Sequence, residues 1–363
     1  MVVEAPNADP LATLPRAKPG PLRSAQVWLR RRLRQRRESS RTSADECFLG
    51  VVSRDPLIVY HLGCDPERLV PVHEALGDRD LWILRGADWE EEGSKHARNW
   101  ADHAELVRKR WPRHRVVLLH NTRSSCESFR RYGLLSIFCH HNALLDEKIF
   151  RVRDDAVKEF AAVYTARITR MKRIELAAQV SPLALLTYGL KTEPGLFEKV
   201  WGLFDEDAWL NLRSGEYRRL DADEMADVYA RSRVGLMLSP KEGGNYASCE
   251  YFLSGLPLVS TPSLGGRDVF YDDRFVRVVE PDPASVARGV DELIALDPDP
   301  HMIREATIER MEWHRDVLRR LLDDICAEAR SNATGAEIWD SNFYSKLCKW
   351  QSTDSLVAEI EGE

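Results

Sequence analysis

The feature that most constrains the fold is an alternation, from Leu57 onward, of short apolar runs with longer amphipathic segments. Short apolar runs bounded by polar or turn residues are typical of strands buried on both faces, as in a parallel sheet with crossover helices. The predicted strands span 57–62, 81–86, 116–121, 134–141, 160–166, 183–189, 208–212, 234–239, 256–261 and 275–281. The sequence therefore predicts an α/β protein.

The segments between these runs carry helical spacing. The predicted helices span 66–76, 89–111, 127–133, 172–180, 221–232, 245–254 and 299–330. Acidic residues in the first turn of 221–232 favour a helix there, because they complement the helix dipole.

The length of the chain favours two domains. A chain of 363 residues with 44% hydrophobic content exceeds the roughly 250–300 residues at which single cores stop growing. The expected parts are a basic tail (1–46), a short Rossmann-like domain (47–141), a hinge (142–156), a second Rossmann-like domain (157–330) and a tail packing back on the first domain (331–363). Ligands bind at the carboxyl ends of parallel strands, so the site is expected in a cleft between the domains.

Composition excludes several classes of partner and location. The net charge is −6 and 30% of residues are charged, which gives no reason to expect nucleic acid as a partner. Seven cysteines lie scattered without a C-x-x-C pair, as in a reducing compartment. With no apolar run of membrane-spanning length and no secretory signal, a cytoplasmic location is expected.

The first 46 residues differ from the rest in being rich in Pro, Ala and Arg. Six arginines fall in one short stretch, at positions 30, 31, 32, 34, 36 and 37. Such a block is usually a solvated tail. The alternative is a short basic amphipathic helix, with Trp28 and Leu33 on its apolar face, that makes weak peripheral contact with anionic lipid.

The stretch 239–268 holds the most informative motif. A predicted strand runs into Gly243 and Gly244, which open a helix capped by Asn245. Exposed amides at a helix start favour an anion. Glu242 precedes the helix and Glu250 lies eight residues on, on roughly the same face. Two carboxylates and free amides suit a ligand with hydroxyls at both ends and phosphates between, which is the form of a nucleotide sugar.

This motif resembles the signature of the group 1 (family 4) retaining glycosyltransferases of GT-B fold. The resemblance rests on Glu242-x7-Glu250 followed by Gly-Leu-Pro at 255–257 and Gly-Gly at 265–266. Two further segments resemble the family: the predicted strand ending at Arg167 with Lys172 after it, and the interdomain segment with Asn142, Asp146 and Phe150. The resemblance covers about residues 115–300 and is strongest over 160–270.

The resemblance implies a GT-B fold and a set of roles. Arg167 and Lys172 would stabilise the leaving diphosphate, so no metal and no cofactor besides the nucleotide-sugar donor is expected. Glu242 would act at the sugar. The donor-binding residues would be Gly243, Gly244, Asn245, Tyr246 and Glu250, with Glu250 on the ribose. Asn245 stands where a second loop glycine is usual, so contacts to the sugar would differ. The first domain would select the hydroxyl acceptor, and because it is short, a partner would complete it or the acceptor site is reduced.

Several residues stay open. Arg170 and Arg173 are alternatives to the two named cations, and Arg267 with Asp268 would either reach the sugar or form an internal ion pair. The family often carries a functional histidine; His120 and His141 are the candidates favoured over His61 and His140, against a purely structural role. A metal site at His140 and His141 is not expected, because neighbours on a strand point to opposite faces.

The function predicted from sequence is thus a metal-independent retaining glycosyltransferase. Two alternatives share the fold: a catalytically inactive nucleotide-sugar-binding protein, and a sugar-nucleotide epimerase or phosphorylase-like enzyme. The sequence leaves open the donor's base and sugar and the identity of the acceptor.

Overall fold

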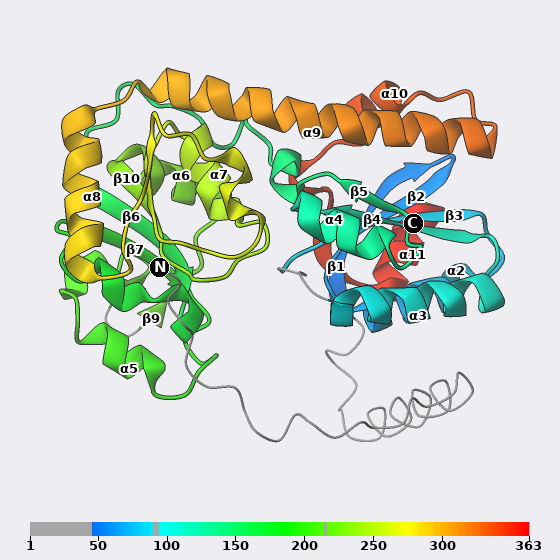
Figure 1. Ribbon diagram of the computed structural model, residues 1–363, viewed down its shortest axis with the longest axis horizontal. Coiled ribbons are helices and arrows are strands. Elements are labelled where there is room, and N and C mark those ends of the chain that lie inside the picture. Colours follow the sequence, from blue (N-terminus) through cyan, green and yellow to red (C-terminus); the bar gives the residue numbers. More distant parts are fainter. Residues whose placement is uncertain (1–45, 90–93, 214–215, 363) are drawn as a thin grey trace, which may run out of the picture. The chain divides into compact units, whose positions relative to one another are not determined.

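A computed structural model describes residues 46–89, 94–213 and 216–362, and these form two sheets covered by helices (Figure 1). The arginine-rich tail lies outside the described residues up to position 45, so its membrane contact stays a prediction. Within the described part of the chain, no helix is long and apolar enough to cross a membrane. All seven cysteines lie in this part and none forms a disulfide.

The first sheet has the strand order β13-β1-β2-β3-β4-β5. Its strands are β1 (Glu46–Arg54), β2 (Leu57–Leu62), β3 (Leu81–Gly86), β4 (His114–His120), β5 (Ser136–Phe138) and β13 (Lys349–Ser352). Strands β2 to β5 are parallel, as predicted. Strand β1, which the apolar runs did not predict, pairs antiparallel with both β2 and β13. The C-terminal segment therefore belongs to the first sheet.

The second sheet is parallel throughout, in the order β12-β11-β10-β6-β7. Its strands are β6 (Phe160–Arg167), β7 (Leu183–Tyr188), β10 (Ser232–Met237), β11 (Leu258–Ser260) and β12 (Val276–Val278). A small antiparallel pair, β8 (Leu212–Arg213) and β9 (Glu216–Tyr217), stands apart from it. The predicted α/β class with two Rossmann-like domains is confirmed.

Helices cover both faces of the first sheet. They are η1 (Pro66–Leu69), α2 (Val70–Leu76), α3 (Ser94–Arg110), α4 (Arg123–Arg130), α10 (Gly335–Asn342) and α11 (Thr353–Glu361), with the short turns η2 (His141–Leu144) and η7 (Ser345–Leu347). Trp100 of α3, Phe129 of α4 and Leu356 of α11 pack in the core of one face. Ile338 of α10 packs in the core of the other. Each face thus buries its own apolar cluster.

The second sheet is covered in the same way. Its helices and turns are η3 (Arg170–Lys172), η4 (Ile174–Ala177), α5 (Leu196–Trp201), η5 (Glu206–Ala208), α6 (Ala222–Ala230), α7 (Tyr246–Leu253), η6 (Gly266–Phe270) and α8 (Pro283–Leu296). Helices α6 and α7 pack in one cluster, while η4, α5 and α8 pack in the other. Helix α6 begins with a capping box between Asp221 and Glu224, which explains why its start was readable from sequence.

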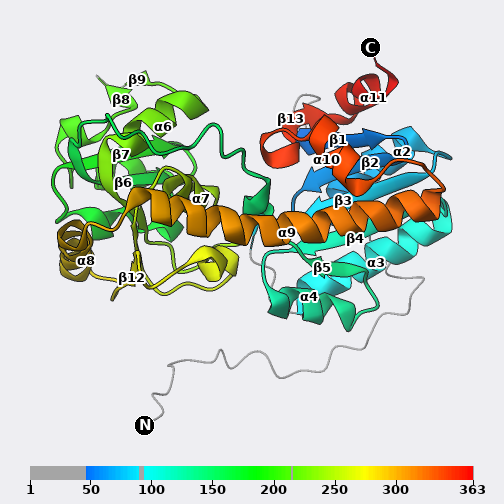
Figure 2. The ribbon, with the colours of Figure 1, turned by 90° about the horizontal axis from the view of Figure 1, so that it is seen from above.

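Helix α9 (Pro300–Ala329) serves both cores. Ile303 and Met311 pack with the second domain, and Leu318 and Leu322 pack with the first. Figure 2 shows the helix continuing from one domain onto the other. It ends at Arg330, which adopts a left-handed conformation.

Three predicted elements differ from the structure. The helix expected over 172–180 is two 3₁₀ turns, because Arg173 adopts left-handed dihedrals (φ 46°, ψ 48°) between them. The strand expected over 208–212 does not form as a continuous strand: Ala208 ends η5, Trp209 makes a single bridge to Leu185, and Leu212 begins β8. Trp209 and Leu212 pack in the apolar cluster with α5 and α8. The strand expected over 134–141 ends at Phe138, so the two histidines after it are not on a strand.

Candidate functional site

The loop between β10 and α7 lies at the carboxyl edge of the second sheet. It carries Glu242, whose side chain is 7% exposed. The Ser239 hydroxyl donates a hydrogen bond to Glu242 Oε1 (2.6 Å), and the Glu242 amide donates to Leu264 O (2.9 Å). Backbone and side chain are both anchored, so the carboxylate is held in one orientation.

Lys172 contacts this carboxylate from the turn that follows the neighbouring strand. It stands in η3, just after β6, and its ammonium donates to Glu242 Oε1 in an ion pair with both side chains largely buried. Strands β6 and β10 are adjacent in the sheet. The motif around 242 and the basic cluster around 170 therefore converge at one point.

The other cations of the cluster are placed differently. Arg173 donates to Leu238 O (2.6 Å) and to Thr261 Oγ1 (2.8 Å), so it braces strand ends. The Arg170 side chain is 81% exposed and lies 3.4 Å from Glu193. The guanidinium carbon of Arg167 lies 5.3 Å from the centre of the Tyr188 ring. Of the four cations, Lys172 is thus the one that pairs with Glu242, whereas Arg167 lies over Tyr188.

Tyr188, at the end of β7, faces several of these charges. Burial raises the pKa of its hydroxyl, the nearby Arg167 lowers it, and the carboxylates of Glu242 and Glu250 raise it further. One side chain thus senses both glutamates and one of the predicted cations. Sequence reasoning missed this residue; the available signal was a polar aromatic at the end of a predicted strand.

Glu250 lies on α7, and its side chain is 5% exposed. The Tyr229 hydroxyl of α6 lies 3.3 Å from Glu250 Oε2, within hydrogen-bond distance. Lys346 Nζ, from η7, lies 3.4 Å from Oε1. The lysine also lies over the Tyr246 ring, 4.4 Å from its centre. Sequence reasoning missed Lys346, because a contact across 96 positions leaves no local pattern.

Two loops contain paired glycines, Gly243–Gly244 and Gly265–Gly266, and we refer to them as the glycine loops. They pack against the first domain. A Cβ atom on Gly243 would lie 2.6 Å from the backbone carbon of Trp89, and one on Gly244 would lie 2.5 Å from His141 Nε2. From sequence these glycines were interpreted as giving a ligand close access. The structure supplies a second reason for them, which is close contact with their own chain.

Three consecutive residues after β5 clasp the loops, and we refer to His140, His141 and Asn142 as the clasp. His140 Nε2 lies 2.9 Å from Gly266 O, and His141 Nε2 lies 2.7 Å from Gly244 O. The side-chain amide of Asn142 donates to Asn245 O (2.8 Å). Asn245 occupies the N-cap position of α7, as predicted, but its side chain makes no capping hydrogen bond.

Burial keeps the clasp histidines neutral. It lowers the pKa of His141 to about 4 and that of His140 well below its ordinary value. A neutral imidazole donates from one nitrogen only. In His140 we assign the proton to Nε2, because Nε2 faces Gly266 O and Nδ1 accepts from the Asn142 backbone amide (3.1 Å). His141 has a carbonyl at each ring nitrogen, Ala87 O at Nδ1 (2.8 Å) and Gly244 O at Nε2 (2.7 Å), so in its neutral form it donates to one of the two. Within the described ranges, no group of three or more His, Cys, Asp or Glu side chains is placed to hold a metal ion.

His120 ends β4 and is buried edge-on against the Phe129 ring, 4.5 Å between ring centres. It lines a narrow cavity at the carboxyl edge of the first sheet. The cavity is bounded by Ala87, Trp89, Asn121, Thr122, Ser125 and the backbone of Gly243, Gly265 and Gly266. His61 lies elsewhere, with Nδ1 3.1 Å from Phe48 O. His120, His140 and His141 thus lie beside the glycine loops, and His61 does not.

Arg267 is 1% exposed and has a bracing role. It donates to Ser239 O (2.9 Å), Ser260 Oγ (3.0 Å) and Thr261 O (2.6 Å). Its hydrogen bonds tie the carboxyl ends of β10 and β11 together, while Asp268 is exposed.

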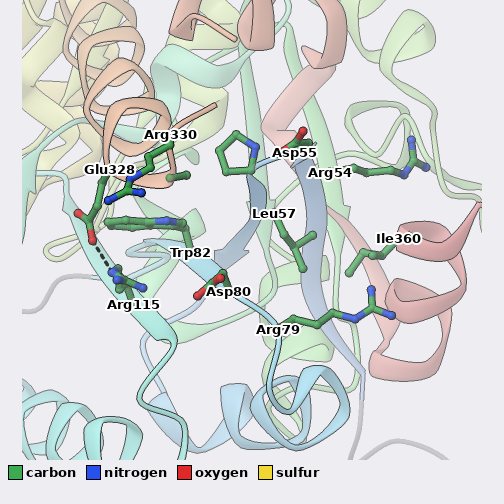
Figure 3. A pocket seen from close by; sticks show the side chains of 12 residues that line it. Arg54, Asp55, Leu57, Arg79, Asp80, Trp82, Arg115, Glu328, Arg330 and Ile360 are labelled. Atoms are coloured by element: carbon green, nitrogen blue, oxygen red, sulfur yellow. Dashed lines mark ion pairs between the residues drawn. The ribbon is translucent and has the colours of Figure 1, made fainter. Parts of the chain in front are cut away.

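A larger cavity of about 480 Å³ lies at the opposite edge of the first sheet (Figure 3). It is lined near the amino ends of β2, β3 and β4, and Arg115 there lies over the Trp82 ring, 5.1 Å from its centre. Two of its arginines have acidic partners: Arg79 pairs with Glu361 (2.8 Å) and Arg115 with Glu328 (2.6 Å). This cavity lies away from every predicted site residue.

No protein-family model matches the chain, and no curated protein is similar to it. Solved structures do match. HepE from Anabaena in complex with UDP aligns with TM-score 0.52 and 13% identity over 74% of this chain and 78% of that one. HepE in complex with UDP and glucose aligns with TM-score 0.51 at the same identity and coverage. TarM aligns with TM-score 0.48 and 14% identity over 69% of this chain and 57% of its own.

The predicted GT-B fold is confirmed. At this level of identity the likeness concerns the fold alone, and the chemistry has to be argued from the site.

Proposed function

We propose that this protein is a metal-independent retaining glycosyltransferase, which moves a sugar from a nucleoside-diphosphate donor to a hydroxyl acceptor. The observation that carries the proposal is the meeting of Lys172 and Glu242 at the carboxyl ends of adjacent parallel strands. Open α/β sheets bind ligands at that edge.

The cations suit the leaving group. As the glycosidic bond breaks, negative charge grows on the diphosphate, and fixed positive charge at that point lowers the barrier. Lys172 and Arg167 supply this charge without a divalent metal. Before the donor arrives, Lys172 compensates the buried charge of Glu242. A diphosphate would then compete for the ammonium and leave Glu242 to accept hydrogen bonds from the sugar.

The remaining roles follow the geometry. Glu250, about one turn into α7, would accept hydrogen bonds from the ribose, and the start of α7 would face the sugar and phosphates. The acceptor hydroxyl would enter beside His120, Asn121 and Ser125, next to the Gly243 loop. We assign no protein nucleophile; the acceptor attacks from the face that the leaving group vacates, which retains the anomeric configuration.

A binding screen tests the proposal. The full chain is titrated with uridine, guanosine and adenosine diphosphate sugars in the presence of EDTA, with uridine first because HepE is seen with UDP. A donor at 100 times its Kd should stabilise the folded state by about 2.7 kcal/mol, and slow donor hydrolysis should follow. The anomeric configuration of the product, read by NMR, tests retention.

The variants of the screen separate the candidate site from the rest of the surface. Glu242→Gln should lose donor turnover, while Arg79→Ala, in the distant cavity, should leave it unchanged. If no nucleotide sugar binds or is hydrolysed, the proposal is wrong. Binding without any turnover would instead indicate an inactive binding protein, and an epimerised sugar formed without acceptor would indicate an epimerase.

A further inference from the structure

Lys346 reaches the candidate donor site from the other domain. Its neighbour Leu347 is buried in the core of the first domain, and β13, which follows, pairs with β1. Lys346 itself adopts a left-handed backbone conformation (φ 71°), an uncommon one for a residue with a side chain. From there its ammonium lies 3.4 Å from Glu250 Oε1 on α7 of the second domain.

Glu250 needs this cation. Its side chain is 5% exposed, and a buried carboxylate is costly unless a cation or hydrogen-bond donors compensate its charge. Among the described residues, Lys346 is the cation recorded within ion-pair distance of it. The lysine is held in turn by the face of the Tyr246 ring, which packs 4.6 Å from His141 of the clasp, centre to centre.

We propose that Lys346 is a positioning residue for Glu250, so that a residue of the first domain completes the nucleotide half of the donor site. The inference rests on the proposed function, because it takes Glu250 as the carboxylate that accepts the ribose hydroxyls. Lys346 compensates the charge of that carboxylate and orients it. Donor binding is thereby linked to the contact between the domains.

A second contact of the Glu250 carboxylate carries no charge. The Tyr229 hydroxyl of α6 lies 3.3 Å from Oε2, and burial raises the pKa of that hydroxyl well above its ordinary value. Tyr229 is therefore a neutral hydrogen-bond donor, and Lys346 supplies the positive charge.

The experiment compares donor Kd values for Lys346→Met, Lys346→Arg and the wild type. Methionine keeps the apolar stem and removes the charge. Lys349→Met is the matched control, because Lys349 follows closely on the same segment and pairs with Glu359 (3.0 Å) with its side chain 58% exposed. Thermal unfolding of each variant checks the fold.

Lys346→Met should weaken donor binding about tenfold or more, because Glu250 loses the cation that compensates its buried charge and orients it. Lys346→Arg should restore most of the affinity, and Lys349→Met should bind as the wild type does. An equal loss in the arginine variant would overturn the positioning role.

Glu250→Gln separates this inference from the proposed function. If that variant binds the donor weakly while Lys346→Met binds with the wild-type Kd, Lys346 has no role and the proposed function stands. If the wild type itself binds no nucleotide sugar, both proposals fail.

Discussion

The Lys172–Glu242 pair shows how two distant stretches of sequence come to one point. Lys172 follows β6 and Glu242 follows β10, and the parallel pairing of these strands brings their carboxyl ends together. The pair is buried enough for its charges to interact strongly, yet 14% of the lysine side chain remains exposed and accessible to an anion.

Lys172→Ala should therefore remove most of the activity and leave the fold intact. Loss of a fixed charge at a developing anion costs about 3 kcal/mol, or roughly a hundredfold in kcat/KM. Arg170→Ala is the matched control, since Arg170 stands in the same 3₁₀ turn with an exposed side chain. Steady-state turnover and thermal unfolding of both variants measure the effect; wild-type turnover by Lys172→Ala would refute the role.

At this scale the sequence predicted part of the site. Two sequence signals pointed to residues that lie at one edge of the second sheet. They are the spacing of Glu242 and Glu250 and the cations that follow position 166. The choice among Arg170, Lys172 and Arg173 could not be made, because it depends on the left-handed turn at Arg173, which apolar periodicity does not reveal. Lys346 was beyond sequence reasoning, since it acts from a different domain.

Hydrogen bonds and close packing hold the clasp and the glycine loops together. Each clasp residue binds a backbone carbonyl of a loop, and the loop glycines leave no space for side chains. The start of α7 is thus set by contacts with the first domain as well as by its own sheet.

Gly244→Ala tests this packing. Its Cβ would lie 2.5 Å from His141 Nε2, and overpacking of this kind costs typically 1–3 kcal/mol. We expect a lower urea midpoint and weaker donor binding. Gly202→Ala is the control, because a Cβ there meets nothing within 4 Å. Equal unfolding midpoints for the two variants would show that the loop is not fixed by the clasp.

The elements predicted best from sequence were the buried parallel strands and the capped helix α6. Their apolar runs and the Asp221 cap are local signals. Strand β1 was missed because it pairs antiparallel across positions 46–54 with partners that include the distant β13. The run around Trp209 was misassigned because Trp209 is buried in the apolar cluster with α5 and α8 and does not belong to a continuous strand.

Across the whole molecule, buried histidines make stability depend on pH. Burial lowers the pKa of seven of them in the folded state: His61, His73, His103, His114, His140, His141 and His314. Unfolded histidines titrate near 6.5. The unfolded chain therefore takes up protons first, and the stability present above pH 6.5 is lost as the pH falls toward 4.

Between pH 7.5 and 5.5, each such histidine should cost roughly 1 kcal/mol of unfolding free energy. His103→Gln should reduce this loss, because burial lowers the pKa of His103 to about 4. His96→Gln, on the same helix and partly exposed, should not. Urea unfolding at the two pH values measures both; an unfolding free energy that does not change with pH would contradict the prediction.

The chain passes between the two domains twice, in helix α9 and in the segment that follows the clasp (143–147). Arg315 joins these two connections by hydrogen bonds. It is 4% exposed and donates from the middle of the helix to Ala143 O and Leu145 O, both at 2.9 Å, and to Glu147. Sliding or twisting of one domain past the other would therefore first have to strip a buried guanidinium of its acceptors, and an unpaired buried charge is strongly destabilising.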